Sequence, residues 1–197
     1  MSSRNYILQQ VQQSQPAVSP LPPLTPPLPY GNDNPVHHFV QVLQGIGGRV
    51  IWVNEAQELA PAISQVFENQ APIATTLPHL PFSQLEAWPQ ADSAPRVLHK
   101  VAVAVLPAAF GVAESGAVWL TEQQYQIRVL PFICQHLAIV VSRSSILPTM
   151  HHAYAHIAHA SYGFGVFIAG PSKTADIEQS LVLGAHGPRT MTVFLMP

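Results

Sequence analysis

Short apolar runs, most of them rich in β-branched side chains, recur along this 197-residue chain and constrain its fold more than any other feature. Nearly continuous apolar runs of strand length are typical of strands covered on both faces. Helix-length stretches separate most of the runs, and strands that alternate with helices indicate a mainly parallel sheet. The sequence therefore predicts an α/β fold, with helices flanking a mainly parallel sheet. The runs occupy residues 49–53, 73–76, 101–105, 117–121, 137–142, 165–170 and 191–196.

Helix start signals precede several of the stretches between these runs. Asn34-Pro35 combines an N-cap residue with proline in the first turn. Asn54 and Gln57 resemble a capping box that opens a second helix. Residues 148–149 begin another helix, which we expect to run through His159.

A leader of 34 residues precedes the expected domain, which covers residues 35–197. Residues 1–15 are polar and compatible with a frayed helix. The run PAVSPLPPLTPPLP at 16–29 excludes a helix or an inner strand, because proline lacks the amide donor. We expect polyproline II there, either as a docking segment for a partner or as a strap over the chain's own domain or a tail.

Composition excludes several classes of protein. Eight Lys and Arg against ten Asp and Glu disfavour a binder of nucleic acid, which needs clustered basic residues. The single cysteine, Cys134, excludes an internal disulfide and a cysteine-held iron–sulfur cluster. We expect a cytoplasmic protein without a secretory signal or membrane span. Only 9% of residues are charged, which suggests a surface covered by a partner.

The segment GPSKTADIEQSLVLGAHGPRT, at 170–190, carries the clearest signal for a binding site. Gly170 follows a predicted strand and allows a ligand to approach the backbone closely. Ser172 and Thr174 offer hydroxyl groups, and a short helix expected from Thr174 would add unpaired amide donors. The carboxyl end of a parallel strand is where α/β sheets bind anions. A capped strand–helix junction without a ligand explains the pattern equally well.

Charged residues around this loop support either interpretation. Lys173 and Arg189 add positive charge, whereas Asp176 and Glu178 would cap the helix, bind sugar hydroxyls or pair with Arg189. The turn that contains His186 would return toward Gly170 in a binding site, or serve as a structural turn. No metal site is predicted. The residues predicted to bind a ligand are Gly116, Gly170, Ser172, Lys173, Thr174, Asp176, Glu178, His186, Gly187 and Arg189.

Glu114 is the candidate catalytic residue. It lies between small residues just before the run at 117–121, in an approachable position that suits a nucleophile or a general base. A glutamate that bonds backbone amides is the more common explanation of such a position. We predict that the Glu114 carboxylate and the backbone after Ile168 meet in one hollow.

Histidines and the cysteine have mainly structural interpretations. His152, His156 and His159 share one helical face, with His151 adjacent, at a spacing that can hold a metal. No carboxylate in the helix completes such a site, so an exposed face is favoured, including one used in a homo-oligomer. Cys134 is interpreted as a buried structural thiol.

The two glycine-bounded segments, GVAESGAVWL at 111–120 and the run at 170–190, resemble the signature of the LUD domain. In particular they resemble the lactate-utilisation protein C (LutC/YkgG-like) family, and ILPTMHHAY at 146–154 is similar to that family's segment before the helix. The resemblance covers the chain from about residue 35 onward. The shared positions are Glu114, Gly116, Gly170, Ser172, Thr174, Asp176, Ile177, Glu178, Gly184, His186, Gly187, Pro188 and Arg189.

This resemblance implies a fold of the NagB/RpiA/CoA-transferase-like type and a role in oxidising L-lactate to pyruvate. It implies partners as well, namely a Cys-rich iron–sulfur subunit and a ferredoxin-like subunit, so that no cluster or covalent cofactor resides in this chain. It assigns no chemical role to individual residues. Two functions remain open: an accessory subunit with an anion-binding loop, or an enzyme that acts on an anionic small molecule through Glu114.

Overall fold

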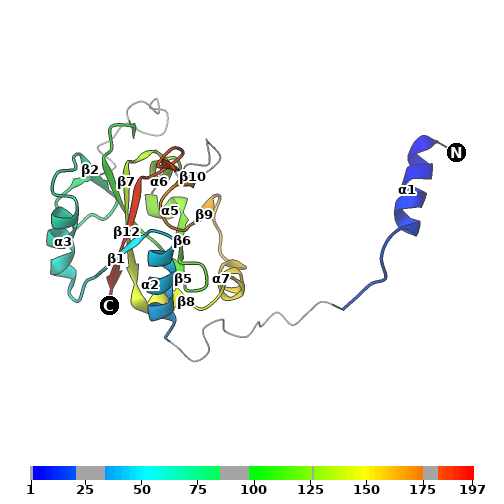
Figure 1. Ribbon diagram of the computed structural model, residues 1–197, viewed down its shortest axis with the longest axis horizontal. Helices are drawn as coiled ribbons and strands as arrows, with labels where there is room; N and C mark the ends of the chain where they lie inside the picture. The colour runs from blue at the N-terminus through cyan, green and yellow to red at the C-terminus, as the bar shows by residue number, and fades with distance from the viewer. Residues whose placement is uncertain (1, 21–33, 85–97, 126, 175–181) are drawn as a thin grey trace.

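A six-stranded sheet with the strand order β1-β12-β7-β4-β2-β3 forms the centre of the protein (Figure 1). The computed structural model describes residues 2–20, 34–84, 98–125, 127–174 and 182–197. Every neighbouring pair in this sheet is parallel, which confirms the predicted α/β fold with a mainly parallel sheet. Its strands are β1 (Arg49–Trp52), β12 (Thr190–Met196), β7 (His136–Ser142), β4 (Val103–Pro107), β2 (Ile73–Thr75) and β3 (Ser83–Gln84).

A second, four-stranded sheet has the order β8-β5-β6-β9. It consists of β8 (Ile146–Leu147), β5 (Phe110–Val112), β6 (Ala117–Thr121) and β9 (Gly165–Ile168). β6 pairs antiparallel with both β5 and β9, so the expectation that the run at 165–170 is a strand of the parallel sheet is wrong. The turn between β5 and β6 is too short for the crossover that a parallel pair needs.

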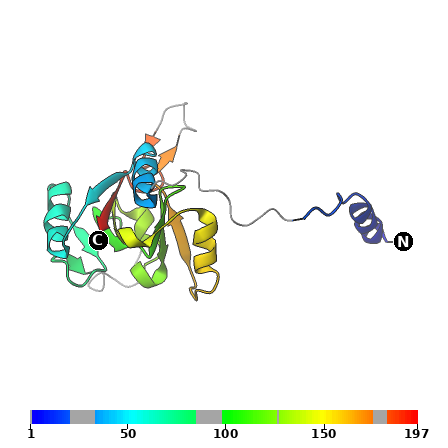
Figure 2. The ribbon, with the colours of Figure 1, turned by 90° about the horizontal axis from the view of Figure 1, so that it is seen from below.

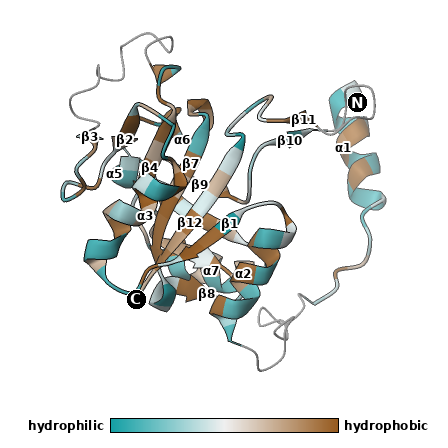
Figure 3. Ribbon diagram, turned by 60° about the vertical axis from the view of Figure 1, so that its left-hand side comes forward, coloured by the Kyte–Doolittle hydropathy of each residue, from teal (hydrophilic) through white to brown (hydrophobic). Residues whose placement is uncertain are grey.

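Alternating side chains divide the core of the parallel sheet between its two faces. One face packs against α3 (Leu59–Val66) and the other against the second sheet. Figure 2 shows α3 and α7 (Met150–Ile157) on opposite outer sides of the two sheets, and Figure 3 shows the apolar character of the central strands. The α3 side includes Val103, Val105, Ala138 and Phe194. The side facing the second sheet includes Ala104, Leu106, Leu137, Ile139, Met191 and Val193, which pack in one core with Val118 and Leu120 of that sheet.

The outer face of the second sheet packs against α7. Phe110, Val112 and Trp119 form a small buried cluster with Ala153 and Ile157 of that helix. The result is four layers: α3, the parallel sheet, the second sheet and α7.

Two of the three predicted helix starts are confirmed. The Asn34 side chain accepts a hydrogen bond from the Val36 amide at 2.8 Å at the start of α2 (Pro35–Gly45), and Thr149 caps α7. The capping box assigned to Asn54 and Gln57 is wrong, because Glu55 and Glu58 form it, at the start of η1 (Ala56–Glu58), which leads into α3.

The other elements are short or peripheral. The polar N-terminal segment contains α1 (Ser3–Gln13), which buries no residue. None of the helices in the described part of the chain is long and apolar enough to cross a membrane. The remaining elements are α5 (Glu122–Tyr125), α6 (Leu130–Ile133), η3 (Arg143–Ser145), β10 (Lys173–Thr174) and β11 (Val182–Leu183).

Candidate functional site

The glycine loop after β9 folds as a strand pair. Lys173 and Thr174 form β10, which pairs antiparallel with Val182 and Leu183 of β11. Thr174, where a short helix was expected to begin, is therefore the last residue of a strand, and residues 175–181, over which that helix would run, lie outside the described residues.

The position of the loop also differs from the expectation. β9 lies in the second sheet, so the loop does not follow a parallel strand. Gly170 has a φ of +71°, and a Cβ added there would lie 3.1 Å from the Ile46 carbonyl oxygen. Because Ile46 caps the end of α2, just before β1, the loop lies beside the amino ends of the parallel strands rather than their carboxyl ends.

The two motif segments at 170–174 and 184–189 are brought together. The Ser172 amide donates to the Pro188 carbonyl at 2.9 Å, and the Gly184 amide donates to the Ser172 carbonyl at 3.0 Å. A Cβ on Gly187 would lie 3.2 Å from the Ser172 Cβ. The return of the HGPR turn toward the glycine loop, which the sequence left open, is observed.

Basic side chains flank this paired segment. Lys173 is exposed, and its Nζ lies 2.9 Å from the place where a Cβ on Gly47 would stand. Arg189 is exposed, and its amide donates to the Gln135 carbonyl at 2.8 Å, at the start of β7. Arg49 begins β1. Among the residues that the structure describes, none of these three cations forms an ion pair; Arg128 with Glu122 is the pair found there.

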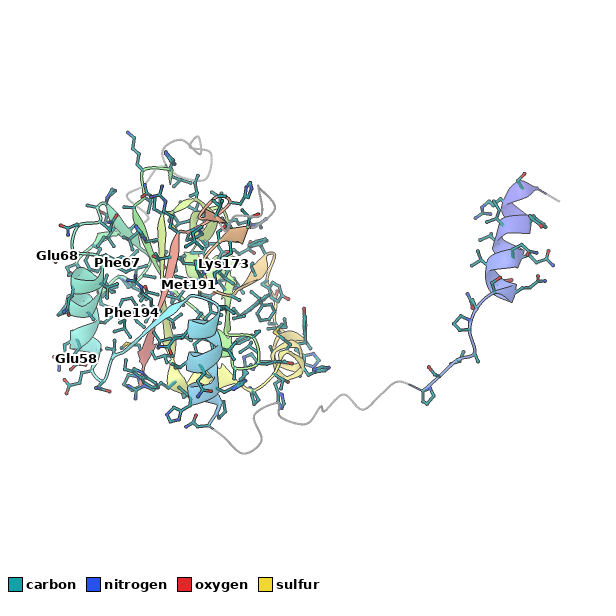
Figure 4. The ribbon with its side chains drawn as sticks, viewed as in Figure 1. Glu58, Phe67, Glu68, Lys173, Met191 and Phe194 are labelled. Carbon is teal, nitrogen blue, oxygen red and sulfur yellow. The ribbon has the colours of Figure 1, made fainter. Side chains whose placement is uncertain are left out.

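The carboxylates of Glu58 and Glu68, which flank α3 in the sequence, do not neutralise this group. Figure 4 shows Glu58 and Glu68 on the α3 side of the parallel sheet, away from Lys173. The positive end of the Lys173 side chain instead lies near the carboxyl end of α2, where a cation is favoured by the helix dipole. Lys173 therefore has a structural role that is compatible with a second role toward a ligand.

His136, at the start of β7, belongs to the same edge. Its Nδ1 lies 2.8 Å from the Thr190 hydroxyl oxygen, and its ring centroid lies 6.0 Å from that of Phe67. Burial lowers the pKa of His136, and the positive charges of Arg189 and Arg49 lower it further. The imidazole is thus biased toward its neutral form beside two guanidinium groups.

Sequence reasoning missed Arg49 and His136 as members of this group. Each is the first residue of a parallel strand, and neighbouring strands bring their first residues to one edge of the sheet. That strand position was the available signal. We name Arg49, His136 and Arg189 the amino-edge cluster.

Glu114 makes a structural contact. It is exposed, and its Oε2 accepts a hydrogen bond from the Met150 amide at 2.7 Å, the first residue of α7. The Glu114 amide in turn donates to the Pro148 carbonyl at 3.1 Å. This geometry supports the interpretation that Glu114 bonds a backbone amide, rather than its interpretation as a catalytic residue.

The Glu114 turn and the glycine loop do lie at the same end of the second sheet. Val118 pairs with Ile168, and Gly116 and Gly170 each stand two residues beyond that pair. Gly116 has a φ of +64° and packs against Leu43 of α2, one helical turn from Ile46. The shared hollow remains a prediction, because the described contact of the Glu114 carboxylate is with α7.

Three motif positions lie outside the described residues, namely Asp176, Ile177 and Glu178. His186 is exposed, and Pro188 is buried beside the paired segments.

The other predicted features are structural. His151, His152, His156 and His159 are all exposed, as expected, and the part of the chain that the structure describes contains no group of three or more potential metal ligands. Cys134 is 2% exposed, and burial raises the pKa of its thiol to about 12. Its interpretation as a buried structural thiol is confirmed.

Comparison with known proteins places these features in a family. The model of the LUD domain matches residues 36–196. A protein named "Lactate utilization protein C" from Geobacillus thermodenitrificans is 32% identical over 149 residues, which cover 72% of this chain and 60% of the relative. One of the same name from Bacillus pumilus is 33% identical over 99 residues, or 47% of this chain and 41% of the relative.

A solved structure shows the same fold. The crystal structure of a DUF162 family protein from Deinococcus radiodurans superposes with a TM-score of 0.61 and 18% sequence identity, and it covers 83% of this chain and 96% of that one. The fold and the paired motif segments thus define an α/β domain with a mainly parallel sheet and a smaller second sheet. The chain belongs to the LUD domain family. It spans 41% and 60% of the lengths of the two curated relatives.

Proposed function

We propose that this chain is a LUD-domain subunit that supports the oxidation of L-lactate to pyruvate, and that its glycine loop and amino-edge cluster bind an anion. The name of the relatives, lactate utilization protein C, supports the first part. The second part rests on one observation, which is a group of cations without an ion-pair partner among the described residues.

The chemistry of the cluster fits a small carboxylate or phosphate. Arg49 and Arg189 carry guanidinium groups, which suit the two oxygens of a carboxylate or a phosphate. Neutral His136 offers a ring nitrogen to the same ligand, and the bond of Nδ1 to Thr190 fixes the orientation of the ring. L-lactate and pyruvate both present a carboxylate to such a group.

In this proposal, partner proteins carry the electrons released by lactate oxidation. The chain has one cysteine, Cys134, which is buried, whereas an iron–sulfur cluster needs several thiolates. We propose that a Cys-rich subunit and a ferredoxin-like subunit supply the clusters, and that the complex works in the cytoplasm. The low content of charged residues, 9%, supports a surface that partners cover.

Genetics provides the test. Deletion of the gene should abolish growth on L-lactate, and a plasmid that carries the wild-type chain should restore it. The double variant Arg49→Ala/Arg189→Ala should restore growth poorly, whereas Arg4→Ala, in the exposed helix α1, should restore it fully. Undiminished growth of the deletion strain on L-lactate would contradict the lactate role.

An enzyme of the CoA-transferase-like class is the second candidate, because the exposed Glu114 turn lies at the same end of the second sheet as the glycine loop. Glu114→Gln keeps an oxygen that can accept the Met150 amide but removes the nucleophilic carboxylate. If Glu114 only caps α7, the variant melts at the same temperature as the wild type and complements growth. Loss of complementation at an unchanged melting temperature would favour the enzyme.

A further inference from the structure

The register of the parallel strands places several residues of the amino edge on one face of the sheet. Thr190 of β12 pairs with His136 of β7. Thr192, two residues further along β12, pairs with Arg49 of β1. Paired residues in neighbouring strands, and residues two apart in one strand, point to the same face. His136 and Arg49 therefore flank β12 on the face that packs against α3, the face on which Phe194 of β12 lies.

A hydrogen bond fixes the His136 ring at this edge. Its Nδ1 lies 2.8 Å from the Thr190 hydroxyl oxygen, and the His136 amide donates to the Ala102 carbonyl at 2.9 Å. The centroid of the Phe67 ring, at the end of α3, lies 6.0 Å from that of the imidazole. The imidazole is therefore held beside the start of β12, and Arg189 is the residue that immediately precedes this start.

Two positive charges act on the imidazole. They belong to Arg189, which precedes β12, and Arg49, which begins β1. β4 places the apolar Val103 opposite His136. In the described part of the chain, Glu68, which follows α3, is not among the charges that act on the ring. Burial, and then the two guanidinium groups, lower the pKa of His136 below its ordinary value of 6.5.

An anion bound by Arg49 and Arg189 would remove the repulsion that these two charges exert. Its negative charge would offset the guanidinium charges and favour a proton on the neighbouring imidazole, so the pKa of His136 would rise. A group whose pKa rises on binding takes up a proton between its free and bound pKa values. Because such coupling is reciprocal, the anion would also bind more tightly as the pH falls through this interval.

The Thr190 hydroxyl suits both charge states of the ring. A hydroxyl oxygen accepts a hydrogen bond from Nδ1–H whether or not Nε2 also carries a proton. Protonation at Nε2 therefore leaves the 2.8 Å contact between Nδ1 and the Thr190 hydroxyl intact. The ring can change its charge without leaving its place beside the two arginines.

We propose that the amino-edge cluster takes up a proton at His136 when it binds its anion, so that the affinity for the anion rises as the solution becomes more acidic. This inference rests on the anion site proposed above and concerns the regulation of that site by pH. The lactate role by itself does not require such a dependence.

Calorimetric titration of the full chain measures the proton uptake. L-lactate, pyruvate and sulfate are the probes, because their charges stay constant between about pH 6 and 8, whereas phosphate itself titrates there. At about pH 6.5, the heat of binding should vary between buffers of different ionisation enthalpy, with a slope of up to about one proton taken up per site. The Kd should be at least about threefold lower at about pH 6 than at about pH 8.

Two variants assign the proton to His136. His136→Asn keeps a side-chain group that can hydrogen-bond Thr190 but does not titrate. The folded variant should therefore bind the anion without proton uptake and with the same Kd at both pH values. His151→Asn, which changes an exposed histidine of α7, is the matched control and should keep the proton uptake of the wild type.

NMR titration of the imidazole resonances tests the same coupling without a substitution of His136. In the free chain, Arg49→Ala or Arg189→Ala should raise the pKa of His136 toward its ordinary value of 6.5. Lys173→Ala should leave this pKa unchanged, because Lys173 is not among the charges that act on the ring. Binding of a probe to the wild type should raise the pKa of His136 as well.

The outcomes separate this inference from the anion site on which it rests. Anion binding without proton uptake, proton uptake that persists in folded His136→Asn, or a pKa of His136 that neither arginine substitution nor a bound anion changes would overturn the inference and leave the anion site standing. No binding of any of the three probes would refute the anion site and this inference with it.

Discussion

Single glycines set how closely the Glu114 turn and the glycine loop approach α2. Gly116 and Gly170 both have positive φ, and both contact the last turn of that helix or its cap. At Gly116 the nearby atoms belong to the backbone of Leu43, which cannot rotate away as a side chain can. The shared motif therefore includes glycines whose role is to pack closely against α2.

Gly116→Ala should destabilise the protein. The new Cβ would lie 2.9 Å from the Leu43 nitrogen at a φ of +64°, and both the strain and the contact are unfavourable. We expect a loss of about 1–3 kcal/mol in the free energy of unfolding, measured by urea denaturation. Gly45→Ala is the matched control, since nothing lies within 4 Å of its new Cβ, and it should be neutral or slightly stabilising. Equal effects of the two substitutions would contradict this account.

Cys134 should be unreactive in the native protein. Because burial raises the pKa of its thiol to about 12, almost no thiolate forms at pH 8. Ellman's reagent at pH 8 should modify it only after the chain is unfolded in guanidinium. Rapid modification of the folded chain would show that the thiol is accessible.

Elements were predicted best where a local signal decides them. Asn34 caps α2 and Thr149 caps α7 through their own side chains, which short stretches of sequence already contain. Thr174, where a helix was expected to begin, lies instead in β10, which pairs with β11 eight to ten residues later in the chain. Helix propensity depends on the local sequence, so it contains no information about pairing between segments that are distant in the chain.

The hydrogen bonds that the Glu122 carboxylate accepts from Arg128 and the Gly163 amide predict a pH dependence of stability. Hydrogen bonding to Arg128 and then to the Gly163 amide lowers the pKa of Glu122 below its ordinary value of 4.5. A carboxyl whose folded pKa is depressed stabilises the fold above the unfolded pKa, and this contribution is lost as the pH falls through the folded pKa.

Glu122→Gln should therefore reduce the dependence of the melting temperature on pH below about 4.5. Glu68→Gln, which changes an exposed glutamate, should leave the acid profile of the wild type intact. Identical acid profiles for wild type and Glu122→Gln would show that these hydrogen bonds do not contribute to stability.

At the scale of the whole molecule, the apolar runs predicted the parallel sheet but not the second one. A run such as residues 165–168 has the same composition in either sheet, so its partner cannot be deduced from it. Because of this error, the glycine loop was expected at the carboxyl edge of the parallel sheet, whereas it lies at the amino edge. The return of the 184–189 turn to the loop at 170–174 was one of two interpretations that the sequence left open, whereas Arg49 and His136 join the cluster only through strand order.

Calorimetric titration of the purified chain with L-lactate, pyruvate and inorganic phosphate tests the central claim most directly. At least one of these anions should bind the wild type, and at a hundredfold excess over its Kd it should stabilise the fold by about 2.7 kcal/mol. The folded double variant Arg49→Ala/Arg189→Ala should bind it at least about tenfold more weakly. Binding of equal strength in the double variant, or no binding of any of the three anions to the wild type, would contradict an anion site at the amino-edge cluster.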